Sequence, residues 1–158
     1  MGVIRLETFI RAPIERCFDL SRSVDLHILS TAQTNERAID GVTSGLMKLG
    51  DVVTWEARHF GVKQKLTVKI VTFEKPLHFR DSQVKGIFHS FDHDHHFETK
   101  DDGTLMTDVF RFTCPFSILG KIADPVVKLH LKNFLETRNQ TIKKVAEGND
   151  WKRLIVSK

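Results

Sequence analysis

Histidine, aspartate and phenylalanine are concentrated in one stretch, residues 88–98, which reads Phe-His-Ser-Phe-Asp-His-Asp-His-His-Phe-Glu. Alternation with a period of two is typical of a β-strand, whose successive side chains point to opposite faces. The residues expected on one face are Phe91, His93, His95 and Phe97, and those on the other are Asp92, Asp94 and His96. One face therefore combines imidazoles, which can bind protons, metals or polar ligand atoms, with large apolar rings.

A second strand is expected from Thr104 to Cys114, after a turn at residues 100–103. If Thr99 and Thr104 flank this turn, His95 faces Asp108 on the neighbouring strand. The same register sets His93 opposite Phe110 and Phe97 opposite Met106. A group of two histidines and one aspartate then lies within an apolar face, which is the composition of a partly polar ligand cavity.

Four interpretations of His93, His95 and Asp108 remain open. They could form a satisfied polar cluster within the sheet, with His95 donating to Asp108, or a patch that orients a ligand. They could include a catalytic pair, in which Asp108 raises the basicity of His95 for general-base chemistry. They could also bind zinc, as two histidines and a cross-strand aspartate can. We expect no metal and no cofactor, because strand alternation sends the remaining ligand-type residues of the stretch to the other face.

The elements around this hairpin are expected to build a sheet. Residues 3–11 alternate as a half-buried strand, and short helices are expected over 14–20 and 24–29, with a brief strand at 36–39. Residues 51–59 and 62–73 are expected to pair around Phe60-Gly61. This hairpin places Trp55 and Leu66 on one face, and Glu56 opposite Lys65 on the other.

The strand expected over residues 77–84 has an ambiguous register. A tight turn at Lys85-Gly86 would set Arg80 and Ser82 beside the histidine face. A longer loop or a bulge would exchange the parity and set Asp81 and Gln83 there instead. We favour the second register, because it also directs Phe79 inward and Arg80 outward.

A long amphipathic helix is expected near the C-terminus. Asp124-Pro125 is a typical helix start, after a short helical piece at 118–123, and Gly148 is a typical stop. Apolar residues recur at helical spacing over 126–147, with Leu131 and Phe134 on the face that would close a pocket. Arg138 lies near this face and could reach inward toward an anion or outward to solvent; we favour solvent or a structural ion pair. The tail over 149–158 could dock through Trp151.

Composition narrows the class of protein. The chain has 158 residues, a formal charge of +4 and 41% hydrophobic residues, which suits one globular domain. Its basic residues are scattered, so we expect no nucleic-acid binding. No apolar run approaches the ~20 residues of a membrane span. Two distant cysteines among apolar neighbours and no secretion signal favour a cytoplasmic location with reduced thiols. The oligomeric state stays open.

The chain resembles the START-related SRPBCC superfamily, which has the birch-pollen-allergen-like helix-grip fold, and is most similar to bacterial polyketide cyclase/dehydrase-like or ligand-binding members. The resemblance spans about residues 3–147. It rests on the segments at 12–18, 54–61, 76–83, 86–88, 91–97, 103–108 and 135–139, together with Pro115. It implies an interior pocket for an apolar or amphipathic small molecule.

The sequence thus predicts an α+β helix-grip domain over residues 1–148, in which a curved antiparallel sheet wraps a long C-terminal helix. Its expected function is binding or transport of a hydrophobic or amphipathic small molecule. The alternative is a cyclase- or dehydratase-type enzyme that uses His95 with Asp108. The residues expected to contact the ligand are Trp55, Leu66, Asp81, Gln83, Phe91, His93, His95, Phe97, Asp108, Phe110, Leu131 and Phe134.

Overall fold

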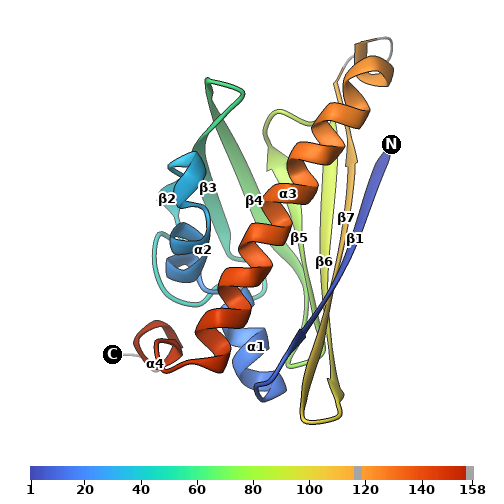
Figure 1. Cartoon of the computed structure of the whole chain (residues 1–158). Helices are drawn as coiled ribbons and strands as arrows, with labels where there is room; N and C mark the ends of the chain where they lie inside the picture. The colour runs from blue at the N-terminus through green and yellow to red at the C-terminus, as the bar shows by residue number, and fades with distance from the viewer. Residues whose placement is uncertain (116–118, 156–158) are drawn as a thin grey trace.

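The structure, a computed structural model, describes residues 1–115 and 119–155 and consists of one antiparallel sheet packed against a long helix (Figure 1). Its strands are β1 (Gly2–Ile10), β2 (Arg37–Gly41), β3 (Val52–His59), β4 (Val62–Glu74), β5 (His78–Lys85), β6 (Ser90–Lys100) and β7 (Gly103–Thr113). Its helices are α1 (Ile14–Ser21), α2 (Val24–Ser30), the 3-10 turn η1 (Ala32–Thr34), α3 (Leu119–Glu147) and α4 (Trp151–Ile155). The strand order is β1-β7-β6-β5-β4-β3-β2.

The sheet curves around α3, which crosses it diagonally, while α1 and α2 lie beside the lower half of α3 (Figure 1). Each strand from β2 to β6 pairs with the strand that follows it in the chain, as short connections favour. β1 completes the sheet beside β7. Among the described residues, no helix has the length and apolar character needed to cross a membrane. The predicted α+β helix-grip architecture is confirmed.

The β6–β7 hairpin has the predicted register, with His95 opposite Asp108 and Thr99 opposite Thr104. Gly103 closes its turn against β1. A β-carbon at this position would lie 2.3 Å from the backbone oxygen of Ile10, so any other residue would force the strands apart. The turn therefore fixes which side chains of β6 and β7 face α3.

Phe97 belongs to the packed core and not to the lining of the cavity described below, which corrects its predicted role. Its ring lies 5.4 Å from that of Phe18, which α1 inserts between the sheet and α3. Phe18 also meets the rings of Phe73 and Phe79 edge-on. Because Phe18 and the aromatic side chains of the strands fill this end of the sheet, the cavity begins further along the strands.

The long helix differs from its prediction at the N-terminal end. Instead of a short piece followed by a new start at Asp124-Pro125, α3 runs unbroken from Leu119 and contains Pro125. The ring of proline fixes a backbone angle that fits a helix, so the helix continues at the loss of one hydrogen bond. Ile118, in the predicted short piece, lies outside the described residues.

The C-terminal half of α3 anchors the helix to the sheet. Leu135, Ile142 and Val145 are buried there in the core. Beyond Glu147, the segment predicted as a tail forms α4, whose Trp151 ring lies 4.0 Å from the guanidinium of Arg16 on α1. One end of α3 is therefore packed on both sides, which leaves the other end to cover the cavity.

A buried aspartate on the outer face of the sheet was not anticipated from the alternation. Asp94 is only 2% exposed, and its carboxylate accepts hydrogen bonds from Arg80 (2.8 Å), His78 (2.8 Å) and Arg111 (2.6 Å). Burial alone would raise the pKa of Asp94, but these three donors hold it far below its usual value. The group ties β5, β6 and β7 together on the side away from α3.

We expect Asp94→Asn to lower the free energy of unfolding at pH 7 by about 1–3 kcal/mol, since charged hydrogen bonds are lost. Because the pKa of Asp94 is lowered by folding, its contribution is fully present above the pKa of the unfolded chain, near 4, and is lost as the pH falls. Urea unfolding at pH 7 and pH 3 should show a difference between the two proteins that narrows only in part by pH 3, because the folded-state pKa of Asp94 lies far below its usual value. Glu7→Gln, in the exposed Arg5–Glu7 pair, is the control and should change stability by less than about 0.5 kcal/mol. Equal stability of Asp94→Asn and wild type at pH 7 would contradict this account.

Candidate functional site

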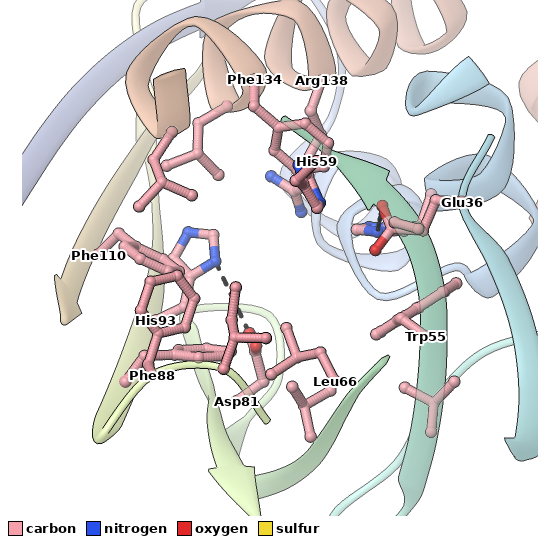
Figure 2. Close-up of a pocket in the computed structure, with 18 of the residues that line it drawn as sticks. Glu36, Trp55, His59, Leu66, Asp81, Phe88, His93, Phe110, Phe134 and Arg138 are labelled. Carbon is pink, nitrogen blue, oxygen red and sulfur yellow. Dashed lines mark hydrogen bonds and ion pairs between the residues drawn. The ribbon is translucent and has the colours of Figure 1, made fainter. Parts of the chain in front are cut away.

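A cavity of about 420 Å³ lies between the sheet and the N-terminal half of α3. Figure 2 shows side chains converging on it from three sides, with Phe134 and Arg138 entering from α3 opposite His93 and Asp81. Its apolar walls include Trp55, Leu66, Val68, Phe91, Phe110, Leu131 and Phe134. The volume is within the range of small-molecule sites, which are typically apolar with a few placed polar groups.

His93 and His95 share one buried carboxylate. His93 Nε2 lies 2.9 Å from Asp108 Oδ1, and His95 Nδ1 lies 3.2 Å from the same oxygen. The first contact is a hydrogen bond, whereas the angles of the second do not suit one. Asp108 is only 1% exposed and lies beneath the two rings, so it does not line the cavity as predicted. Its direct contact with the histidines matches the predicted cross-strand position.

Two residues of α3 complete the support of Asp108. Asn139 Nδ2 donates to Asp108 Oδ2 at 2.7 Å, and Arg138 Nη1 lies 3.4 Å from Oδ1. Arg138 is 4% exposed and also donates to the backbone oxygen of Ser21. Arg138 therefore forms a structural ion pair and is not in solvent, and it also reaches inward, since its side chain lines the cavity. Asp108 is thus one buried carboxylate through which the helix is bonded to the sheet.

Asp81 is the third member of the polar group, on the cavity side. In the favoured register it lies opposite His93, and its Oδ1 atom lies 2.9 Å from His95 Nε2 and 3.9 Å from His93 Nδ1. Figure 2 shows the carboxylate of Asp81 turned toward the His93 ring. Gln83 does not line the cavity, which corrects its predicted role. Its side chain instead bonds the backbone of Phe88 and shapes the β5–β6 loop.

These contacts shift the pKa values of the two histidines in opposite directions. Burial lowers the pKa of His93, and the neighbouring charge of His95 lowers it further. Burial also opposes the charge of His95, but its contacts with Asp108 and Asp81 outweigh this and raise its pKa. Burial alone would raise the pKa values of both carboxyl groups, yet the histidines keep both lowered. The two carboxylates therefore favour the charged form of His95, whereas burial favours the neutral form of His93.

A second polar group lies along the β2–β3 side of the cavity, away from His93. Glu36 is 8% exposed, and its Oε2 atom lies 3.1 Å from His27 Nε2. The ring of His27 in turn lies 4.2 Å from that of Trp55. Glu36, Trp55 and His59 are seen together at this wall in Figure 2. The cavity thus has polar groups at two separated places with an apolar zone between them.

A pair of histidines joins the β3–β4 hairpin to α3 at the cavity wall. His59 Nδ1 lies 3.0 Å from His130 Nε2, and the ring of Phe60 lies 4.5 Å from that of His130. Burial lowers the pKa of His59, and the charge of His130 lowers it further, against the opposing effect of Glu36. One ring donates and the other accepts, so the contact requires at least one neutral imidazole.

We expect acid to weaken this contact. Because folding lowers the pKa of His59, its contribution is present above the unfolded value near 6.5 and is lost as the pH falls. Two charged rings would repel by about 1 kcal/mol, so a bound neutral dye such as N-phenyl-1-naphthylamine should leave roughly fivefold faster at pH 5.5 than at pH 7.5. Stopped-flow fluorescence measures this rate. His59→Gln, which keeps a polar side chain but does not titrate, should flatten the dependence, and an unchanged pH profile in this variant would refute the role of the pair.

Nine of the predicted contact residues line the cavity: Trp55, Leu66, Asp81, Phe91, His93, His95, Phe110, Leu131 and Phe134. His59, His130 and Glu36 line it too but were not anticipated. For His130 a signal exists, since it lies three residues after Val127 and four before Phe134 on one helical face. Glu36 precedes a short strand and has no periodic pattern that could have pointed to it.

Comparison with known proteins supports the fold. No protein-family model matches the chain, and no curated protein sequence matches it significantly. The solved structure of TTHA0849 from Thermus thermophilus matches with a TM-score of 0.75 and 16% identity, over 90% of this chain and 95% of that one. Major latex-like protein 151 from Panax ginseng matches with a TM-score of 0.70 and 20% identity, over 93% and 98% of the two chains.

A third similar structure is the di-domain ARO/CYC protein StfQ from the steffimycin biosynthetic pathway. It has a TM-score of 0.73 and 10% identity, over 92% of this chain and 50% of that one. At sequence identities this low, the likeness indicates a shared arrangement of helices and strands but not a shared chemistry of the site. By its sheet order, its long final helix and these likenesses, the chain has the helix-grip fold that these solved structures share, which is the fold expected from the sequence.

Proposed function

We propose that this protein binds one apolar or amphipathic small molecule in the cavity between the sheet and α3. The single observation that carries the proposal is a cavity of about 420 Å³ whose walls are mostly apolar, with Asp81, His93 and His95 among the polar side chains that line it. An apolar enclosure lowers the free energy of a ligand in proportion to the apolar area removed from water. The polar groups then fix its orientation.

The polar end of the ligand is proposed to lie against Asp81, His93 and His95. All three side chains line the cavity, as does Arg138, whereas Asp108 lies behind the histidines, where it bonds His93 and Arg138. His95 offers a charged donor and Asp81 an acceptor, so a hydroxyl, carboxyl or amide group could be bound there. The apolar body of the ligand would then extend past Leu66 toward Trp55.

A second candidate is an enzyme of the cyclase or dehydratase type that acts on the same ligand class. It is favoured by the raised pKa of His95, whose imidazolium faces the cavity and could donate a proton to a leaving hydroxyl group. Asp81→Asn separates the two functions. In a binding protein it weakens affinity alone, whereas in an enzyme turnover falls by much more than affinity.

Native mass spectrometry of protein purified without a tag tests the proposal. We expect a single extra mass, of one small molecule per chain, which disappears in denaturing solvent. We further propose a cytoplasmic location, consistent with the buried thiol of Cys17. Protein that carries no small molecule and also fails to take up a neutral apolar dye would overturn the proposed function.

A further inference from the structure

Three potential metal ligands converge on the cavity side of the sheet. Asp81 on β5 and His93 and His95 on β6 present a carboxylate oxygen and two ring nitrogens that all lie within 4.8 Å of one another. Asp81 Oδ1 lies 2.9 Å from His95 Nε2 and 3.9 Å from His93 Nδ1. Ligand atoms around a tetrahedral zinc ion lie about 3.3 Å apart, since its bonds are about 2.0–2.1 Å. Closing the group on an ion needs shifts on the order of 1 Å.

The carboxylate beneath the rings selects the nitrogens that a metal would need. Asp108 Oδ1 faces Nε2 of His93 but Nδ1 of His95. In the absence of an ion His95 Nε2 donates to Asp81, and a metal would displace this proton. With protons kept on His93 Nε2 and His95 Nδ1, the lone pairs of His93 Nδ1 and His95 Nε2 then face Asp81. Metal-binding histidines almost always donate their other ring N–H to such a group, which fixes the tautomer and the ring orientation.

The outer face of the sheet provides an internal comparison. His78, Asp94 and His96 also lie close enough together to hold an ion. There, however, Arg80 and Arg111 donate to both carboxylate oxygens of Asp94, so two guanidinium charges occupy the position that a cation would take. At the inner group one guanidinium, that of Arg138, is balanced against two carboxylates, so the group carries a net negative charge once a binding ion has displaced the proton of His95.

We propose that Asp81, His93 and His95 form a binding site for a divalent transition metal ion, with zinc as the best match to two nitrogens and one oxygen. Asp108 does not touch the ion; it bonds His93 Nε2 and lies 3.2 Å from His95 Nδ1, beneath both rings. Because all three ligands line the cavity, the fourth position of the ion faces the interior and is open to a water molecule or to a polar atom of a bound molecule. This proposal departs from the sequence-based expectation of no metal, which considered Asp108 as the carboxylate ligand and not Asp81.

Metal titration of the whole chain, purified without a tag or metal column, tests the site. We expect one Zn²⁺ per chain, measured by competition with a chromophoric chelator, and visible absorption bands of four-coordinate Co²⁺ as the spectroscopic readout. Mg²⁺, which prefers six oxygen ligands, should not compete. Asp81→Asn and His95→Ala should each lower zinc affinity by roughly 100-fold or more. Asp108→Asn should lower it by the roughly 10–100-fold typical of losing a group that orients a ligand.

His96→Ala is the matched control, because it removes an exposed ligand of the outer group and leaves the inner one intact. Its zinc affinity should equal that of the wild type. Uptake of a neutral apolar dye shows that each variant is folded. Because dye uptake tests the proposed function and zinc binding tests the metal site, the failure of one can be told from the failure of the other. Absence of stoichiometric zinc binding, or binding that survives Asp81→Asn and disappears in His96→Ala, would overturn the inner site.

Discussion

Replacing Asp108 with alanine is expected to lower the free energy of unfolding by about 3–5 kcal/mol, the largest effect of any single change proposed for this chain. The substitution removes the acceptor of His93 and Asn139 and leaves the Arg138 guanidinium buried without its carboxylate. A buried charge that loses its partner keeps the full cost of leaving water. Chemical denaturation followed by circular dichroism measures the loss.

A double-mutant cycle separates this electrostatic effect from simple loss of packing. In an Arg138→Met background no guanidinium remains to be stranded, so Asp108→Ala should cost less, with a coupling energy of about 1–3 kcal/mol. Asp92→Ala, on the outer face of β6, is a control and should cost under about 1 kcal/mol. If the Asp108 and Arg138 effects add without coupling, the pair does not join helix to sheet as described.

Filling the cavity should abolish most of the ligand binding. Leu66 lies on β4 with its side chain at the cavity. Leu66→Trp therefore replaces an isobutyl group with a bulky indole ring in the space that a ligand would occupy. We expect affinity for N-phenyl-1-naphthylamine to fall at least tenfold, or about 1.4 kcal/mol, while the fold is kept. Fluorescence titration measures the affinity.

Val71→Trp provides the matched control for this experiment. Val71 lies on the same strand but is 45% exposed on the outer face. Its replacement by tryptophan adds a side chain of the same kind outside the cavity. Its affinity for the dye should remain within about twofold of the wild type. Equal losses in both variants would indicate a general effect on the sheet, and no loss in either would place the dye elsewhere.

The main features of the fold follow from local sequence patterns. Alternation over residues 91–97 together with the turn before Gly103 predicted which side of β6 faces Asp108 of β7, because a strand offers only two faces. The parity of Asp81 could be favoured but not decided, since it depends on whether the β5–β6 connection is tight or long. The α3 start was placed too late because proline inside a helix resembles proline at its first turn.

The site was harder to predict because the depth of a side chain in the interior and its partners on other helices or strands leave little trace in the sequence pattern. Asp108 and His95 share a face, but the sequence does not tell which one lies nearer the ligand. Arg138 is a cation on a helix, and only the three-dimensional packing places Asp108 within its reach. Glu36 comes from a short irregular segment, where no periodicity separates a buried carboxylate from an exposed one.

The central claim is that a small molecule occupies the interior between β3, β4 and α3, and nuclear magnetic resonance of the labelled protein during titration with N-phenyl-1-naphthylamine tests it most directly. We predict saturation at one dye per chain, with the largest shifts at the Trp55 indole N–H and at the methyl groups of Leu66 and Leu131, which line the cavity. Val71 on the outer face should barely move. Shifts confined to the outer face, or a titration that never saturates, would contradict the claim.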